Sequence, residues 1–595
     1  MDHALRVGVL LGTLDQPNWV HQSIREIQAS GVAQIVTSFV VRSHHPKVTA
    51  TTNAPVDPHL LYKLYTRLDA RLFRNEVDAL ATRSVYDLLS GYPQLEVTLD
   101  RSDDNTSWSL AKGELTNARA FGLDVLLSVE ETFTPDHLAP FAVAARYGVW
   151  SYHLGDRLET KGGPGGFWEV MDCRPLTGSL LAMTSGDPPR SRIIYRSYAP
   201  SDNRSVRRSQ NNYYWKTADF ALRKLRNLYE NGECALADVS SDSSVPIPPR
   251  YSRIPNNREM LRLLGRLATN YVRGKVDQFI RAPQWFMAFS RNGPGESGIR
   301  EVGSWTSLVP PIGREWADPF PIHWRDHNFI FFEEYVAKSR KAHISVVEID
   351  SSGRFKEPTV VLARDYHLSY PFVFEWEGQH YMIPETSQNQ TVEVYRAENF
   401  PYSWKLEAVL LDNIRAVDAT IAEIWGRWWM FVNVAVEGAS TADELHLYYA
   451  DGPLGPWTPH RTNPVKSDVR STRPAGRIFL SDGTYIRPSQ DCGERYGHAI
   501  VLNRIRRLDL NGYLEQEIGR IEPARPGELL GVHTLNVWGN LTCIDGEVKR
   551  SRLLHRFRRP SFDESPLHVD SQLPRAGEAG ANPTNPLGLR VGAIP

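Results

Sequence analysis

The hydrophobic pattern of the first 230 residues alternates between two periods. Leu5–Leu11 is a continuous apolar run, typical of a strand that is covered on both faces. Asn18–Ser30 places apolar residues at helical spacing and ends before Gly31. The same reasoning predicts a long helix over Leu60–Leu89. It also predicts four further strands: Gln34–Arg42, Leu95–Leu99, Val125–Val129 and Val149–His153. This alternation predicts a Rossmann-like α/β domain over residues 1–230, with a mostly parallel, doubly wound sheet.

The next stretch, residues 231–282, differs in character and predicts a helical connector. Tyr213–Tyr229, just before it, is expected to be a helix, and Asp238–Pro249 is rich in Ser, Asp and Pro, as exposed loops are. Met260–Ile280 is basic and amphipathic. We interpret it as a connecting helix that packs against a domain, with binding to a membrane surface as the alternative.

Over residues 283–557 the pattern changes to short strands separated by Gly, Asp and Asn. Five segments with a polar or proline-containing start before an apolar strand recur about every fifty residues. They are WADPFP around Asp318, LSYPFVF around Pro371, VDATIAEIW around Asp418, TRPAGRIF around Pro474 and GVHTLNVW around His533. This repeat predicts an all-β five-bladed β-propeller, with an irregular β-sandwich as the alternative. Residues 558–595 are rich in Pro, Gly and Ala and predict a disordered tail.

Composition and charge exclude several classes of partner. There are 68 Lys and Arg against 69 Asp and Glu, so no basic excess favours nucleic acid. The four cysteines form no CxxC pair, and we expect neither a metal site nor disulfides: Cys173, Cys234, Cys492 and Cys543. The N-terminus lacks a signal-peptide pattern and no apolar run is long enough to span a bilayer. We therefore expect a cytoplasmic protein without an integral membrane segment, for which peripheral membrane contact stays open.

The first group of candidate site residues surrounds His153. This histidine lies at the carboxyl end of a predicted strand, where open α/β sheets place their ligands. The glycine-rich segment that follows permits close approach of the backbone to a ligand. Ser151, Asp156 and Trp168 are the candidate substrate-binding residues around this histidine.

This stretch resembles the formyltransferase family, over residues 5–230 and most closely at 148–181, where His–x–Gly–Asp is followed by GPxGFWEV. The resemblance implies formyl-tetrahydrofolate as the cofactor and His153 as the proton-transfer residue. The family's oxyanion-stabilising Asn is Ser151 here, and its later Asp position falls near Pro189, two residues from Asp187. Formyl transfer, ligand binding without formyl chemistry and a purely structural His153 all stay open.

The second group of candidates stands at or near the starts of the predicted innermost propeller strands. Polar residues there point toward a shared axis, where carboxylates on separate blades could work on a glycosidic bond. The candidates for acid, base or nucleophile roles are Asp318, Asp418, Glu334 and Glu385. Those for substrate binding are Arg473, Arg487, Gln490, Asp491, Tyr370 and His533.

The propeller half resembles arabinanase- and xylosidase-type glycoside hydrolases and, more closely, the propeller domain of plant glucosamine inositolphosphorylceramide transferases. ADPFP, FFEEY, YPFVF, IPET, DATI, RPAG and GVHT carry this resemblance. The hydrolase pattern implies Asp318 as general base and Asp418 as an orienting residue. The general-acid position is Arg473, whose guanidinium cannot donate a proton at neutral pH. Arg473 and Arg487 suit an anion such as a sugar phosphate or a nucleotide diphosphate.

Three hypotheses follow. The first is a carbohydrate-active transferase in the biosynthesis of a surface polysaccharide, glycolipid or glycosylated metabolite, with a phosphorylated or nucleotide-linked sugar in the propeller. In the plant enzymes a separate glycosyltransferase domain follows the propeller, and we expect none in this chain. The second is an N-formyltransferase for an amino sugar, with the propeller as a carbohydrate-binding module. The third is a non-catalytic scaffold.

Overall fold

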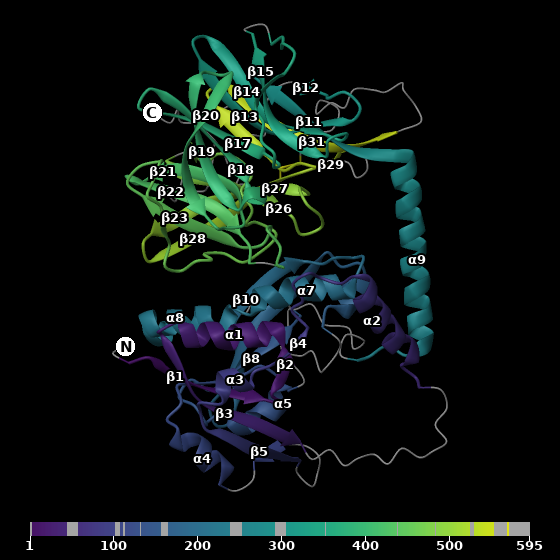
Figure 1. The fold of residues 1–595 in the computed structure, drawn as a ribbon, viewed down its shortest axis with the longest axis vertical. Coiled ribbons are helices and arrows are strands. Elements are labelled where there is room, and N and C mark those ends of the chain that lie inside the picture. Colours follow the sequence, from purple (N-terminus) through teal and green to yellow (C-terminus); the bar gives the residue numbers. More distant parts are fainter. Residues whose placement is uncertain are drawn as a thin grey trace, which may run out of the picture. The chain divides into compact units, whose positions relative to one another are not determined.

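The computed structural model describes residues 3–43, 57–101, 108–110, 113–130, 133–155, 165–237, 253–291, 305–350, 353–436, 438–481, 483–523, 529–551 and 568–569. The chain divides into two compact units (Figure 1). Unit 1 comprises Met1–Asn270 and Val436–Ser440, and unit 2 comprises Tyr271–Ala435 and Thr441–Pro595. Within the described residues, no helix combines the length and the apolar character needed to cross a bilayer.

Unit 1 is built on an eight-stranded mixed sheet in the order β10-β9-β8-β7-β1-β3-β5-β6. The five central strands, β8 to β5 in that order, are parallel, and the three outer strands pair antiparallel. The strand bounds are β1 Leu5–Leu11, β3 Ala33–Ser43, β5 Gln94–Arg101, β6 Trp108–Leu110, β7 Val125–Ser128, β8 Val149–Leu154, β9 Leu176–Ser185 and β10 Arg190–Pro200. The chain winds outward from β1 in both directions, as in doubly wound folds.

Both faces of this sheet are covered, which explains the continuous apolar run of β1. Val9 belongs to one core with Trp19 and Ile24 of α1, whereas Leu10 belongs to a second core with Phe39. Successive strand residues point to opposite faces, so a strand between two helical layers needs apolar residues at every position. The helices of this unit are α1 Asn18–Ala29, α2 Leu60–Leu72, α3 Tyr86–Leu89, α4 Glu114–Ala120, α5 Pro135–Leu138, α6 Phe167–Met171, α7 Val206–Thr217 and α8 Phe220–Asn231.

Two helices expected from the sequence are shorter than predicted. The helix expected at Leu60–Leu89 ends at Leu72, and an extended segment follows that includes β4 (Thr82–Ser84), paired with β2 (Asp15–Pro17). The carbonyl groups of Ala79 and Ala81 accept the amides of Trp19 and Asn18, which open α1. The first amides of a helix lack partners inside the helix, so this segment is used to cap α1 rather than to continue α2. Likewise, Tyr213–Tyr229 falls into two helices, α7 and α8.

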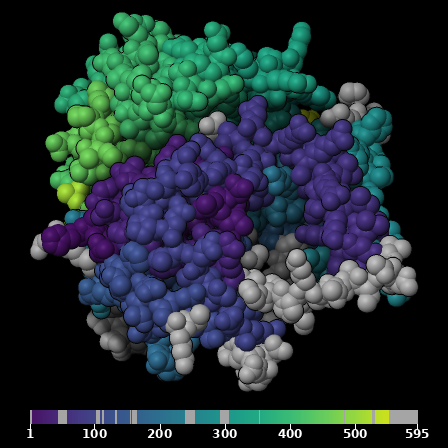
Figure 2. All heavy atoms as spheres, turned by 60° about the horizontal axis from the view of Figure 1, so that its bottom comes forward, coloured from purple at the N-terminus to yellow at the C-terminus, as the bar shows by residue number. Residues whose placement is uncertain are grey.

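A single long helix, α9 (Asn257–Ile280), leads from unit 1 into unit 2 (Figure 1). Its N-terminal half packs Met260, Leu263 and Leu267 into a core with Phe167 and Trp168 of α6. The predicted helix at Met260–Ile280 is thus present and begins three residues earlier. Figure 2 shows that early (purple) and later (blue) segments of unit 1 lie side by side on one face.

Unit 2 consists of five antiparallel sheets, which are the five blades of a β-propeller. Four blades follow in sequence, as β13 to β16, β17 to β20, β21 to β24 and β25 to β28, the last with β32 at its edge. The fifth blade joins β11 (Arg281–Ser290) and β12 (Thr306–Leu308) to β29 (Leu529–Gly531), β30 (Leu535–Trp538) and β31 (Leu541–Ser551). The pairing of β11 with β31 runs from Arg281 opposite Ser551 to Ser290 opposite Thr542, and closes the ring.

The innermost strands are the ones that the repeat predicted. They are β13 Arg314–Trp324, β17 Ser369–Trp376, β21 Ala416–Ile424, β25 Phe479–Ser481 and β30. The middle and outer strands are β14 His327–Val336, β15 Lys341–Ile349, β16 Thr359–Leu362, β18 Gln379–Thr386, β19 Thr391–Asn399, β20 Ser403–Asp412, β22 Arg427–Val434, β23 Leu445–Ala450, β24 Thr458–Pro459, β26 Thr484–Asp491, β27 Ala499–Asp509, β28 Gly512–Glu522 and β32 His568–Val569. The five-bladed propeller is confirmed, and the β-sandwich alternative is not what the chain adopts.

Candidate functional site

Three innermost strands begin with the same backbone distortion. Asp318, Tyr370 and Asp418 all have positive φ, between 45° and 54°, and each sits where the pairing with the next strand shifts register. Residues other than glycine rarely adopt this region, because the side chain crowds the backbone. A bulge of this kind re-aims side chains. It brings Asp318 of the first blade and Asp418 of the third into contact with residues of other blades.

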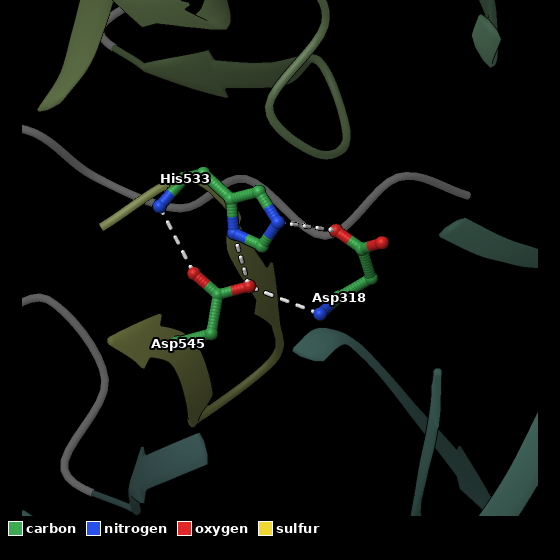
Figure 3. A group of neighbouring side chains, drawn as sticks. All are labelled: Asp318, His533 and Asp545. Carbon is green, nitrogen blue, oxygen red and sulfur yellow. Dashed lines mark hydrogen bonds and ion pairs between the residues drawn. The ribbon is translucent and has the colours of Figure 1, made fainter. Parts of the chain in front are cut away.

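Asp318 forms one group with His533 and Asp545 (Figure 3). His533 Nδ1 lies 2.7 Å from Asp545 Oδ2, and its Nε2 lies 3.6 Å from Asp318 Oδ1, so the imidazole stands between two carboxylates. Asp318 also accepts the hydroxyl of Thr534 at 2.6 Å and the backbone amide of Tyr370 at 3.1 Å. Asp545 accepts the backbone amides of Asp318, His533 and Thr534 at 2.9–3.0 Å.

The burial of this group shapes its protonation. Asp318 and His533 are 3% and 2% exposed. Burial raises the pKa of Asp318 to about 7, although the charge of His533 acts in the opposite direction. For His533 burial lowers the pKa, but the Asp545 and Asp318 carboxylates outweigh it and raise the pKa to about 9. The imidazole is therefore positively charged at neutral pH, and Asp318 titrates near neutrality.

A second group is centred on Asp418. Arg473 Nε lies 2.6 Å from Asp418 Oδ2, and the terminal nitrogen of the same guanidinium lies 3.4 Å from Glu385 Oε2. Gln490 donates to Asp418 Oδ2 at 3.2 Å and to the carbonyl of Pro474. Burial and the Asp418 charge raise the pKa of Glu385 well above its usual range, despite Arg473. This shift favours the protonated form of Glu385, while Arg473 remains charged.

Aromatic rings cover both groups. The Trp285 ring lies 4.1 Å from the His533 ring, and the Tyr496 ring meets His533 edge-on at 5.4 Å. The Arg473 guanidinium lies 4.9 Å from the Tyr496 ring. Tyr496 is 48% exposed, whereas Arg473 is buried. Solvent thus reaches the Tyr496 ring first, and a ligand for Arg473 would have to displace or stack on that ring.

Asp318, His533 and Asp545 offer ligand atoms that lie within 4.8 Å of one another, and among the described residues they are the group that could hold a metal ion. Histidine nitrogens and carboxylate oxygens are suitable donors for a divalent cation. Here both imidazole nitrogens face carboxylate oxygens at ion-pair distance. A cation would have to take the place of an imidazole proton, so the arrangement fits a protonated histidine better than a metal.

Three predicted site residues lie in saturated networks elsewhere in the blades. Glu334 accepts hydrogen bonds from Arg314, Trp316, His343 and Ser345, and although burial opposes them, these bonds lower its pKa to about 2. Glu334 is therefore a carboxylate at neutral pH, which disfavours the proton-donor role, while its candidate role as a base stays a prediction.

Arg487 and Asp491 also have partners of their own. The Arg487 guanidinium donates to both carboxylate oxygens of Glu515, at 2.7 and 2.8 Å, and to the carbonyls of Ser471 and Thr472. Asp491 accepts from Arg520 at 2.6 Å. These partners occupy every guanidinium nitrogen of Arg487, so the structure favours a structural role over the expected contact with a substrate anion.

Tyr370 contributes to the axis through its backbone and its hydroxyl. The hydroxyl oxygen lies 2.7 Å from Thr420 Oγ1 and accepts the amide of Gly476 at 2.7 Å. Burial raises the pKa of Tyr370 well above its ordinary value. The phenol is neutral and fully buried, so it connects blades two, three and four rather than facing a ligand.

In unit 1, β8 carries Ser151 and His153 as predicted. Ser151 Oγ lies 2.9 Å from His153 Nε2, and burial lowers the pKa of His153 to about 4. The imidazole is therefore neutral. Trp168 is buried in the core beneath α9 and donates to the carbonyl of Arg253, so it does not line an open pocket as expected. Asp156 lies outside the described residues.

Sequence reasoning missed Asp545, Tyr496 and Trp285 as members of the axis groups. Asp545 interrupts the apolar strand Leu541–Ile544, and an acidic residue inside such a strand was the available signal. Nothing in the spacing of the repeats marks Tyr496 and Trp285 as residues that cover His533.

A family model described as "Glucosamine inositolphosphorylceramide transferase 1, N-terminal" matches residues 313–525. Curated relatives named glucosamine inositolphosphorylceramide transferase 1 include one from Arabidopsis thaliana, 38% identical over 239 residues, and one from Oryza sativa subsp. japonica, 34% identical over 230 residues. These alignments cover 39% and 38% of this chain and 30% of each relative. The chain thus matches less than a third of the length of these relatives.

Solved structures with some similarity include the family 117 glycoside hydrolase Zg3597 of Zobellia galactanivorans, at 12% identity and a TM-score of 0.30 over 47% of this chain and 96% of that one. The RS223 β-xylosidase has 14% identity and a TM-score of 0.29, over 40% of this chain and 96% of that one. TM-scores this low carry no activity over to the chain. The residues that the family model matches contain Asp318, Glu385, Asp418 and Arg473, and they are similar in sequence to the N-terminal region of a glucosamine inositolphosphorylceramide transferase.

Proposed function

We propose that this chain is a glycosyl-transferring enzyme of glycolipid biosynthesis, and that a phosphate- or nucleotide-linked sugar reacts at the axis of the propeller. One observation carries the proposal. The segment similar to a glucosamine inositolphosphorylceramide transferase contains four ionisable groups from four blades, and the charges of the other three act on Glu385: Asp318, Glu385, Asp418 and Arg473. Buried ionisable groups with strongly shifted pKa values gather preferentially at functional sites.

The protonation states supply an acid and a base. The raised pKa of Glu385 favours its protonated form, and the pKa of Asp318 is about 7. In the proposed step the acceptor hydroxyl oxygen forms a bond to the anomeric carbon of the sugar and its proton passes to Asp318. The bond from that carbon to the phosphate oxygen breaks, and the oxygen takes the proton of Glu385. Arg473 stays charged beside Glu385 and stabilises the negative charge on the departing phosphate.

The substitution Glu385→Gln tests this proposal. Glutamine has nearly the shape of a protonated glutamate, so it keeps the hydrogen bonding of the neutral acid but cannot release a proton. We expect transfer from nucleotide sugars to an inositolphosphoryl lipid to fall by about 100-fold or more, while the thermal unfolding temperature stays unchanged. Glu407→Gln, at a half-exposed position on β20, is the matched control and should leave transfer intact.

Two results would overturn the assignment. Full activity of the Glu385→Gln variant would show that Glu385 is not the proton donor. An absence of both transfer and sugar-nucleotide binding by the unaltered full chain would instead favour the scaffold hypothesis, for which the burial of Arg473 beneath Tyr496 is the supporting observation.

Formyl transfer by unit 1 is the second candidate function, and the contact between Ser151 and His153 favours it. The neutral imidazole has a nitrogen lone pair that can take a proton during attack by an amine, although its lowered pKa makes it a weak base. Turnover of formyl-tetrahydrofolate with an amino sugar, abolished in His153→Ala and retained in Glu385→Gln, would assign the chemistry to unit 1. Its absence would leave His153 as a structural residue.

A further inference from the structure

The outer side of α2 presents two adjacent rows of exposed side chains. One row is apolar and recurs every four residues: Leu60, Leu64, Leu68 and Leu72. The other row is basic, keeps the same interval and stands one position earlier: Lys63, Arg67 and Arg71. Residues four apart lie on one face of a helix, so both rows run along its length. The exposed fraction of the leucines rises from 40% at Leu60 to 66% at Leu72.

The inner side of α2 is used by unit 1, so the fold does not need these two rows. Asp69 accepts the amide of Arg207 at 2.7 Å, and the Tyr62 ring meets the Phe167 ring edge-on at 5.2 Å. Leu61 and Tyr65 pack against the same core as Phe167. The leucine row is therefore a second apolar face of α2, and it has no function in the core of the unit.

Helix α9 extends this surface. The amide of Leu61 donates to Asn257 Oδ1 at 2.9 Å, and the amide of Asn257 donates to the carbonyl of Pro58, so the first turns of the two helices are joined. Figure 1 shows α2 beside the first turns of α9, and Figure 2 shows both segments at the surface. Within unit 1, α9 also carries Leu261 outside its packed face, and this side chain is more than half exposed.

We propose that α2, together with the first turns of α9, binds the surface of an anionic phospholipid bilayer. An amphipathic helix that lies in the membrane interface buries an apolar row among acyl chains, while neighbouring Lys and Arg contact the headgroups. The alternation of leucine and cation along α2 has this form. Lys63 pairs with Asp57 at 2.6 Å, so Arg67 and Arg71 are the cations of this row that a headgroup phosphate would contact. A second copy that presented the same face of α2 would bury the leucines but would also bring the two basic rows together. The chain as a whole has a net charge of −1, so the basic row is a local feature.

This inference rests on the proposed function, because membrane binding by unit 1 would bring the chain to the bilayer that holds a lipid acceptor. Vesicle binding can be measured without any assay of sugar transfer. The full chain is sedimented with phosphatidylcholine vesicles, with and without phosphatidylserine, at low and high salt. We expect strong co-sedimentation with the anionic vesicles, weakened by salt, and little with the neutral ones.

The double variant Leu64→Asp/Leu68→Asp removes the apolar row. We expect its partition onto anionic vesicles to fall about tenfold or more, with unchanged circular dichroism because both positions are exposed. The matched control is Leu514→Asp on β28, an apolar residue of similar exposure in unit 2, which should bind vesicles as the unaltered chain does.

The outcomes separate the membrane from other occupants and from the catalytic proposal. Equal vesicle binding by the Leu64→Asp/Leu68→Asp variant, or no binding by the unaltered chain, overturns the inference. A dimer that this variant dissociates, without vesicle binding, assigns the surface to a second copy and also overturns it. Vesicle binding by a chain that shows no sugar transfer would support this surface while refuting the proposed function.

Discussion

The contact between His533 and Asp545 makes a prediction about how the stability of the propeller depends on pH. The folded chain holds the pKa of His533 at about 9, against 6.5 for an ordinary histidine. A proton bound more tightly in the folded state stabilises that state fully below pH 6.5, and this contribution disappears as the pH rises through 9. Each pKa unit is worth 1.36 kcal/mol, so the contribution is about 3 kcal/mol.

The substitution Asp545→Asn removes the carboxylate that raises this pKa most. At pH 6 the variant loses the ion pair with the imidazolium, and its side chain also accepts three backbone amides less well. At pH 9.5 His533 is neutral in both proteins, so only the weaker acceptance of the amides remains. We therefore expect the free energy of opening to differ between the unaltered chain and the variant by about 3 kcal/mol more at pH 6 than at pH 9.5.

Hydrogen exchange of peptides spanning residues 529–551 measures this opening locally, without interference from unit 1. A difference of 2.5 pKa units corresponds to about a 300-fold change in the opening equilibrium. Asp509→Asn, at an exposed turn where the carboxylate pairs with Arg507, is the matched control and should leave exchange in this segment unaffected. A cost of Asp545→Asn that is the same at pH 6 and pH 9.5, or larger at pH 9.5, would refute the charged state of His533.

Three further substitutions test how the propeller handles buried charge and close packing. Arg487→Met should destabilise unit 2 by about 3 kcal/mol in denaturant unfolding, because buried Glu515 keeps only the cation of Lys466 and the carbonyls of Ser471 and Thr472 lose their donor. Arg477→Met should lower the free energy of unfolding far less, or should stabilise unit 2, because Arg477 Nε has no partner and burial lowers the pKa of the guanidinium to about 9. A loss as large as that of Arg487→Met would contradict this. Gly497→Ala should lower the unfolding temperature, since φ is +64° and a Cβ would lie 2.8 Å from the Trp285 ring; an unchanged temperature would show that the ring moves freely.

Local patterning predicted the parts of the fold that depend on one segment at a time. β1 occupies Leu5–Leu11 as expected, because a strand that is buried between two helical layers needs apolar residues at every position. The five repeated segments predicted the blades for a similar reason, since each blade buries its faces against its neighbours. The helix expected at Leu60–Leu89 was too long because the capping of α1 by Ala79 and Ala81 is a contact between distant segments, which periodicity does not record.

The role of the candidate residues stays a prediction, and their pairings could not be predicted from the motifs. Arg473 contacts Asp418, whereas Asp318 lies in a separate group with His533 and Asp545. The ion pair between Arg487 and Glu515 depends on the register of β26, β27 and β28, and no motif specifies that register. Formyl transfer by the residues around His153 stays a prediction.

The contacts that build the proposed site also tie the blades of the ring together. Asp318 of blade one accepts from Tyr370 of blade two and from Thr534 of blade five, while Arg473 of blade four spans Asp418 of blade three and Glu385 of blade two. Removal of any charged member therefore loosens the ring as well as the site, and a loss of activity alone would not separate the two effects. Glu385 is the exception, because its raised pKa favours the neutral form in the folded chain. Glutamine can replace it without exposing an unpaired charge, so a loss of activity without a loss of stability at this position would report on proton transfer itself.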